Sequence, residues 1–154
     1  MNQPLYQAIN PSDQAQLKSL LNELGYDLDD ARIEQHIREI RNRGGEVFVA
    51  KLADRVVGCV AAIVDVRLAA GIQGEIVSLV VTEPYRGQGI GNGLIKSAED
   101  WLSQTVDTIR VRANSQRRDA HRFYAKAGYE LSKTQKIFTK HRLNASLADP
   151  EKLA

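Results

Sequence analysis

The chain has 154 residues, of which 43% are hydrophobic and 26% are charged, and its formal net charge is only +2. This length and composition are typical of a single compact domain with an apolar core. A charge balance so close to neutral gives no support for nucleic acid or a membrane surface as a partner. No apolar run is long enough to span a membrane, and the first residues lack the basic and apolar blocks of a secretion signal.

The only cysteine, Cys59, lies within the apolar run 56–64. A single cysteine cannot form an internal disulfide, and this favours a cytoplasmic location. Because apolar surroundings suppress formation of the thiolate, we interpret Cys59 as a buried structural residue and not as a nucleophile.

Helical and strand periodicities alternate along the chain, and each change is marked by a cap or a breaker. Asn10-Pro11 indicates a helix start, because asparagine can cap the first turn and proline fits the first helical position. Gly25 and Gly44-Gly45 end the first two helices. In chain order we predict a strand at 5–9, helices at 11–24 and 29–43, strands at 46–52, 55–66 and 75–81, a helix at 92–102, a strand at 108–113, a helix at 118–127, and strands at 129–131 and 136–141.

This order, β-α-α-β-β-β-α-β-α-β-β, predicts an α/β fold with a mixed, mostly antiparallel sheet flanked by helices. The sequence contains no linker and no internal repeat. We therefore expect one domain over residues 1–142 and a loosely held C-terminal tail over residues 143–154.

A glycine-rich loop, Arg86-Gly-Gln-Gly-Ile-Gly91, joins the predicted strand 75–81 to the predicted helix 92–102. Alternate glycines let backbone N–H groups face outward, and the helix start adds positive potential, so the loop suits a pyrophosphate. Arg86 adds a charged, forked donor. The loop is neither a Walker motif, which needs Gly-Lys-Ser/Thr, nor a complete G-x-G-x-x-G fingerprint, because Asn92 stands where the third glycine belongs. The alternative is a tight turn without a ligand.

Together with the segment 114–129, this loop resembles the GNAT superfamily of acyl-CoA-dependent N-acyltransferases. The first family motif, Arg/Gln-x-x-Gly-x-Gly/Ala, matches Arg86, Gly89 and Gly91. The second, Ala-x-x-Phe-Tyr-x-x-x-Gly-Phe/Tyr, is matched from Ala120 to Tyr129. The element order also agrees over roughly residues 4 to 142. These motifs are specific for the superfamily but not for the substrate.

The resemblance implies acetyl-CoA as the acetyl donor and implies no metal. In the family the pantetheine arm pairs with the central strand, and the loop amides bind the pyrophosphate. A side chain after the next strand often bonds the pantetheine, and Asn114 stands there. For Arg117, before the following helix, contact with the nucleotide end of CoA is one interpretation. The cofactor-binding residues so implied are Leu79, Val80, Val81, Arg86, Gly87, Gln88, Gly89, Ile90, Gly91, Asn92, Asn114, Arg117 and Tyr124.

Acetyl transfer to an amine requires a deprotonated amine, a stabilised carbonyl oxygen and a protonated leaving thiolate. Glu75 is the candidate base, since regular alternation places it on the same strand face as Leu79. The alternatives are a strand-edge role for Glu75, or water as the base. Tyr124 is the candidate acid, and its alternative is packing beside Phe123. A backbone N–H near Leu79 or Val81 would serve the carbonyl oxygen.

The remaining polar residues carry weaker interpretations. We interpret most arginines of the segment 110–122 as a solvated surface. The alternatives are contact with the nucleotide of CoA and binding of nucleic acid. Aromatic residues for base stacking are missing among these arginines, which disfavours nucleic acid. His121 is expected at the surface, and no histidine has metal-ligand spacing. The acceptor side is expected at 26–28 and 132–135, where a cationic amine could be drawn by Asp27, Asp29, Asp30 and Asp65. The alternative is capping and turn formation, which is the favoured interpretation of Asp29 and Asp30.

We therefore predict an N-acetyltransferase that moves an acetyl group from acetyl-CoA directly to a primary amine of a small molecule. The alternatives are a protein or peptide N-acetyltransferase and a non-catalytic acyl-CoA sensor. The expected partner is the amine, without nucleic acid or membrane. The sequence leaves open the identity of the amine, the preferred acyl chain and whether the chain forms a homodimer.

Overall fold

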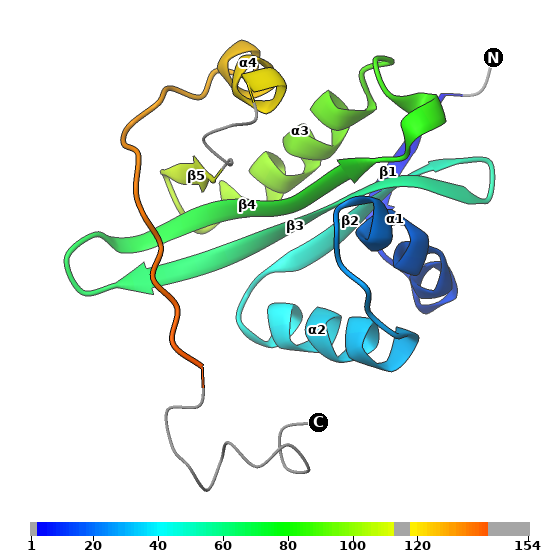
Figure 1. Ribbon diagram of the computed structural model, residues 1–154, viewed down its shortest axis with the longest axis horizontal. Helices are drawn as coiled ribbons and strands as arrows, with labels where there is room; N and C mark the ends of the chain where they lie inside the picture. The colour runs from blue at the N-terminus through cyan, green and yellow to red at the C-terminus, as the bar shows by residue number, and fades with distance from the viewer. Residues whose placement is uncertain (1–2, 113–117, 142–154) are drawn as a thin grey trace, which may run out of the picture.

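In the computed structural model, the described residues are 3–112 and 118–141 (Figure 1). Five strands form one sheet in the order β1-β2-β3-β4-β5. Neighbouring strands are antiparallel except β4 and β5, which are parallel. The predicted mixed, mostly antiparallel sheet is therefore confirmed. The strands are β1 (Leu5–Ala8), β2 (Glu46–Leu52), β3 (Arg55–Arg67), β4 (Gly71–Val81) and β5 (Ile109–Val111).

Helices cover both faces of this sheet (Figure 1). On one face lie the 3-10 helix η1 (Pro11–Gln16), α1 (Leu17–Glu23) and α2 (Asp30–Asn42). On the other lies α3 (Ile90–Leu102), which follows the short 3-10 turn η2 (Glu83–Tyr85), and α4 (Arg118–Lys126) packs against the same side. The sheet thus separates two apolar clusters, one under α1 and α2 and the other under α3.

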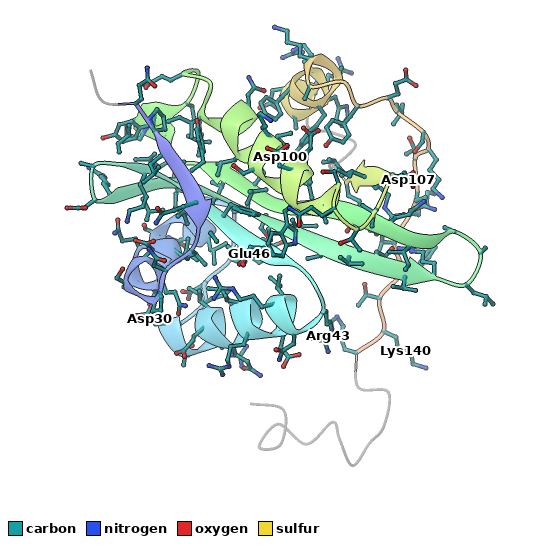
Figure 2. All side chains as sticks on the ribbon, turned by 180° about the vertical axis from the view of Figure 1, so that it is seen from behind. Asp30, Arg43, Glu46, Asp100, Asp107 and Lys140 are labelled. Atoms are coloured by element: carbon teal, nitrogen blue, oxygen red, sulfur yellow. The ribbon has the colours of Figure 1, made fainter. Side chains whose placement is uncertain are left out.

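The helix ends follow the predicted chemistry. Asp29 caps α2, since its Oδ1 accepts the N–H of Arg32 at 2.8 Å. Asp30 and Arg43 lie at opposite ends of α2 (Figure 2), where their charges suit the helix dipole. The helix predicted from Pro11 differs at its start, because η1 is 3-10 and the α-helix begins only at Leu17.

The tight first turn of η1 has an electrostatic cause. Asp13 is buried, and its Oδ2 accepts the N–H of Asn10 at 3.2 Å. Its Oδ1 forms an ion pair with Lys51 Nζ at 2.9 Å. The buried carboxylate therefore joins the first turn to β2 and holds the chain in the tighter helix.

Strand pairing decided two segments that the sequence pattern misassigned. Residues 71–74, which the predicted strands at 55–66 and 75–81 leave out, belong to β4, because they pair with the end of β3 from Val64 to Arg67. The strands predicted at 129–131 and 136–141 are wrong, since residues 129–141 form no strand. Leu131, Ile137 and Phe138 are exposed there. An alternating pattern favours a strand but supplies no partner edge, and pairing is what makes a strand.

No helix in the described ranges is long and apolar enough to cross a membrane. The predicted tail, residues 143–154, lies outside the described residues. Its boundary with the domain therefore stays a prediction.

Leu94 and Leu68 form a matched pair for testing the core. Leu94 is fully buried under the sheet, whereas Leu68 is fully exposed at the β3–β4 turn. Leu94→Ala should lower the free energy of unfolding by about 2–5 kcal/mol, because it leaves a cavity in a packed cluster. Leu68→Ala should change it by less than about 0.5 kcal/mol. Urea unfolding measures both, and equal losses would contradict this assignment of the core.

Candidate active site

A cleft opens where β4 and β5 separate. Among the described residues, the two strands pair between Gly74–Ile76 and Ile109–Val111, and no pairs are found beyond this point. The cleft has a volume of about 520 Å³. Its walls are the end of β4, the glycine loop, the start of α3 and α4. The predicted cofactor-binding residues that line it are Leu79, Val80, Val81, Arg86, Gly87, Gly89, Ile90, Gly91, Asn92 and Tyr124.

Three of the predicted residues do not join this lining. Gln88 is exposed on the loop but is not part of the cleft wall. Asn114 and Arg117 lie outside the described residues, so their roles stay predictions. Four further residues line the cleft that the family motifs did not indicate: Tyr85, Arg112, Asp119 and Lys126.

A β-bulge in β4 lies at the opening of the cleft. Val80 pairs with Cys59 and Val77 pairs with Ala61, so Ser78 and Leu79 together face a single residue of β3. Ser78 has a φ of +56°, a left-handed conformation that is uncommon for a residue with a side chain. The extra residue reverses the alternation of β4 beyond it.

The reversal is visible in the packing on both sides of the sheet. Val77 and Val80 both pack in the cluster under α1 and α2, although regular alternation would place them on opposite faces. Leu79 and Val81 pack in the cluster under α3. The cleft-lining side chains of β4 thus face α3 only because of the bulge.

Glu75 does not share a face with Leu79, and the predicted shared face is wrong. A Cβ on Gly74 would lie 2.9 Å from Leu102 of α3, so Gly74 faces α3 and its neighbour Glu75 faces the other way. Leu79 packs on the α3 side. The prediction used strict alternation, and the bulge between the two residues breaks it.

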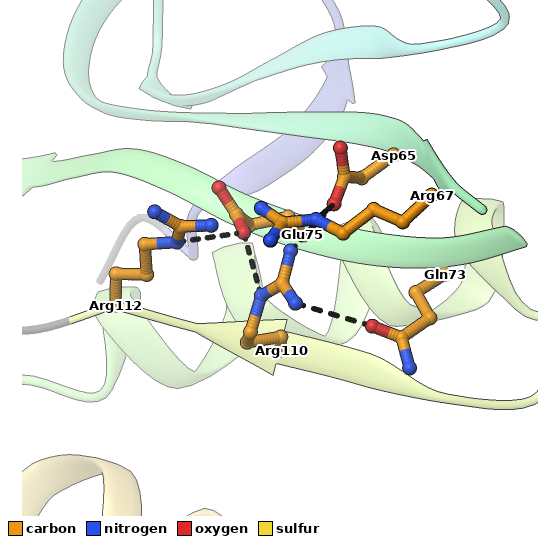
Figure 3. Close-up of polar contacts among 6 residues, drawn as sticks. All are labelled: Asp65, Arg67, Gln73, Glu75, Arg110 and Arg112. Carbon is orange, nitrogen blue, oxygen red and sulfur yellow. Dashed lines mark hydrogen bonds and ion pairs between the residues drawn. The ribbon is translucent and has the colours of Figure 1, made fainter. Parts of the chain in front are cut away.

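Glu75 is a buried carboxylate held by two arginines (Figure 3). Its Oε1 accepts hydrogen bonds from Arg110 Nε at 2.8 Å and from Arg112 Nε at 3.1 Å. Within the described residues, no bond to Oε2 is found. An amine can therefore reach this carboxylate at Oε2, or at Oε1 after Arg112 has moved.

Arg110 is the centre of this charged cluster. Its Nη1 donates to Gln73 Oε1 at 3.2 Å and its Nη2 to Asp65 Oδ2 at 2.7 Å (Figure 3). Asp65 also accepts from Arg67 Nε at 2.6 Å. The hydrogen bonds from Arg67 and Arg110 lower the pKa of Asp65, and those to Glu75 and Asp65 raise the pKa of Arg110. Asp65 is therefore an ion-pair partner and not an unengaged attractor for a cationic amine.

The glycine loop presents backbone donors toward the cleft. Gly87 and Gly89 have φ of +77° and +84°, and no atom lies within 4 Å of a Cβ built on either. Glycine is therefore required at both for conformation and not for packing. Within the described residues, the N–H groups from Gly87 to Asn92 meet no protein acceptor. At Gly91 glycine is required for packing instead, because a Cβ there would lie 3.1 Å from the Phe123 ring.

Arg86 holds the loop in place from within the protein. Its Nε donates to the carbonyl of Val81 at 2.8 Å, and its Nη2 donates to Glu23 Oε1 at 3.3 Å. Glu23, the last residue of α1, also accepts from Thr82 Oγ1 at 2.7 Å and from the N–H of Glu83 at 3.1 Å. One carboxylate of α1 therefore ties three parts of the loop entry together. No local pattern indicates these contacts of Glu23, because about sixty residues of chain separate it from its partners.

Tyr124 reaches the cleft from α4 within a set of aromatic rings. Its ring lies edge-on to those of Phe123, at 5.3 Å between centroids, and Tyr129, at 6.2 Å. The Tyr129 hydroxyl donates to Glu99 Oε2 at 2.7 Å, and burial together with Glu99 raises the pKa of Tyr129. The aromatic set joins α4 to α3 and directs Tyr124 to the cleft.

The predicted buried role of Cys59 is confirmed. Cys59 is buried in β3, and its Sγ–H donates to the carbonyl of the bulge residue Ser78 at 3.7 Å. Burial raises the pKa of its thiol to about 12. His121 is exposed on α4, and the described residues contain no group of three or more metal-ligating side chains.

Comparison with known proteins identifies the family. Residues 5–129 match the model of the acetyltransferase (GNAT) family, and the chain therefore belongs to it. Among curated proteins it is 47% identical over 60 residues to aminoalkylphosphonate N-acetyltransferase of Salmonella typhimurium. That alignment covers 38% of this chain and 39% of the relative. The chain spans about two fifths of the length of the curated relatives it matches.

Solved structures share the fold over nearly the whole chain. Glucosamine-6-phosphate N-acetyltransferase of Arabidopsis thaliana matches with a TM-score of 0.76 and 17% identity, covering 89% of this chain and 98% of the other. AAC(6')-Iy in complex with a CoA-containing bisubstrate analogue matches with a TM-score of 0.78 and 14% identity, covering 90% and 99%. At such identities these matches show the fold, and they confirm the predicted fold class.

Cys59 provides a test of the burial beneath the bulge. Because its pKa is raised to about 12, the folded protein should react with a disulfide reagent at mildly alkaline pH far more slowly than a free thiol. In denaturant one thiol per chain should react at once. Rapid labelling of the folded protein, followed as released chromophore, would show that β3 and β4 open readily at this point.

Proposed function

We propose that this protein is an N-acetyltransferase that transfers an acetyl group from acetyl-CoA to a primary amine of a small molecule. The observation that carries the proposal is the cleft between the separating strands, with unpaired loop amides at one end and Tyr124 in its wall. Membership of the GNAT family supports it, since this family uses acetyl-CoA.

The residues of the cleft fit an extended donor with a diphosphate. The amides from Gly87 to Asn92, together with the start of α3, would hold the diphosphate. The edge of β4 beyond Ile76 has no partner in β5, so its segment 79–81 is available to pair with the amide groups of a pantetheine arm. Bound acetyl-CoA would supply the acyl thioester at the bulge.

We assign the proton transfers to groups around the bulge. The amine loses its proton as the N–C bond forms, and the leaving sulfur gains one as the C–S bond breaks. Tyr124, on the α3 side, donates the proton that the leaving sulfur gains. Glu75, on the opposite face of the sheet, receives the proton of the amine through its Oε2 or through water. The amine therefore enters from the α1 and α2 side. A backbone N–H at the bulge stabilises the carbonyl oxygen.

Direct transfer requires no covalent intermediate on the protein. Cys59 is the only cysteine, and its burial and raised pKa exclude it as an acyl carrier. A small acceptor agrees with the curated relative, which acts on aminoalkylphosphonates. Measuring thiol release from acetyl-CoA across a panel of amines and peptides tests the proposal. Binding of CoA without turnover of any amine would instead favour a sensor.

Tyr124→Phe tests the acid. It should lower kcat about 100-fold or more, because proton donation to the thiolate is lost. The Kd for CoA, measured by calorimetry, should change less than about twofold, since the ring and its packing remain. Thr105→Val, which removes an exposed hydroxyl outside the cleft, is the control and should retain full activity. A Tyr124→Phe enzyme as fast as the parent would remove Tyr124 from this role.

Glu23→Gln tests the support of the loop. The amide keeps one acceptor oxygen but loses the charge that pairs with Arg86, so the loop entry should loosen. We expect the KM for acetyl-CoA to rise severalfold with kcat nearly unchanged. Glu34→Gln, on an exposed glutamate of α2, should leave both constants as they are. A fall in kcat with unchanged KM would contradict a role in holding the loop.

A further inference from the structure

The cluster around Glu75 carries one more positive than negative charge. Its anions are Asp65 and Glu75, and its cations are Arg67, Arg110 and Arg112. These five residues lie on β3, on β4, and on or directly after β5 (Figure 3). Asp65 of β3 is the strand-register partner of Gln73 in β4, and Glu75 of β4 is that of Arg110 in β5. The cluster can therefore accept one further anion without unbalanced charge.

The arginines of the cluster differ in how fully the protein engages them. Arg110 is 22% exposed and uses all three of its nitrogen atoms on Glu75, Gln73 and Asp65. Arg112 is 43% exposed and bonds Glu75 through Nε alone among the described residues. Glu75 would keep its bond to Arg110 if Arg112 moved. Arg67 also bonds through Nε alone, but Arg112 is the arginine of this cluster that lines the cleft, so its forked end is the part able to engage a ligand there.

Arg112 also lines the cleft, and its position separates it from the diphosphate end. Val111 pairs with Ile76, so Arg112 follows β5 at the level of Val77, before the bulge. The glycine loop begins after Val81, and Val77 and Val81 pair with Ala61 and Gly58, which are three residues apart, so at about 3.3 Å per residue β4 ends about 10 Å beyond the level of Arg112. A ligand group bound by Arg112 would therefore lie beside the bulge, where transfer is proposed, and apart from the loop amides that would hold the diphosphate.

We propose that Arg112 binds an acidic group of the acceptor, so that the substrate is a small zwitterion whose primary amine and phosphonate, phosphate or carboxylate are separated by a few bonds. This inference rests on the function proposed above and specifies its substrate class. A guanidinium group suits a phosphonate, phosphate or carboxylate, because its two parallel N–H groups can bond two oxygen atoms of the same anion. With the acid at Arg112, the amine is directed to the adjacent Glu75. A polycationic acceptor is disfavoured, since Arg112 repels its second charge.

Steady-state kinetics with acceptors of matched length test the inference. The probes are 2-aminoethylphosphonate, β-alanine, the neutral 3-aminopropanol and the dication 1,3-diaminopropane. The parent enzyme should prefer an acid-bearing amine over the neutral one by about tenfold or more in kcat/KM, the size expected for a hydrogen-bonded charge pair. A preference for the neutral amine or the dication would overturn the substrate class while leaving the acetyltransferase function intact.

Variants of Arg112 identify the residue responsible. Arg112→Gln should lower kcat/KM for the acid-bearing amines about tenfold more than for 3-aminopropanol, so that the preference between them is lost. Arg112→Lys, which keeps the charge and lacks the fork, should restore part of the preference. Arg38→Gln, on an exposed arginine of α2, is the control and should retain it. Thermal unfolding of each variant verifies that it is folded.

The outcomes separate the two proposals. A rise in the KM for acetyl-CoA in Arg112→Gln, with an unchanged acceptor preference, would assign Arg112 to the donor and overturn the inference. Failure of the parent enzyme to acetylate any of the four amines, or any member of a wider panel, would refute the proposed function itself. Calorimetry of the parent with 2-aminoethylphosphonate in the presence of CoA gives an independent result, and binding that Arg112→Gln leaves unweakened would also overturn the inference.

Discussion

One extra residue in a strand reverses the faces of all the residues beyond it. In β4 that residue lies in the pair Ser78 and Leu79, and its consequences reach both sides of the sheet. It turns Leu79 and Val81 toward α3, where the cleft lies, and leaves Glu75 on the face of α1 and α2. The strained φ of Ser78 persists because the core holds β4 on both sides, with Cys59 beneath it.

The same point in the sheet is where backbone pairing with β5 stops. Unpaired backbone donors in a folded protein need partners, and here they lie along a cleft and around a glycine loop. Glu23 and Arg86 hold the loop entry from the opposite layer. A helix on one face of the sheet therefore positions the loop that borders the cleft on the other face.

Much of the architecture followed from local patterns. Caps, glycines and apolar periodicity predicted the helices at 29–43 and 92–102 and the succession of elements along the chain up to β5, because short-range chemistry decides those features. The glycine loop was predicted in the same way, and ten of the predicted cofactor-binding residues line one cleft. The prediction of strands at 129–131 and 136–141 was wrong, because an alternating pattern contains no information about whether a sheet edge is available for pairing.

The sequence by itself determined the family, the loop that faces the cleft and the burial of Cys59, since each depends on neighbours within a few residues or on composition. Only the tertiary structure decided the face of Glu75, its bonds to Arg110 and Arg112, and the support of Arg86 by Glu23. These depend on strand register and on contacts between residues far apart in the chain. One bulge is enough to change the register, and no local pattern in the sequence indicates it.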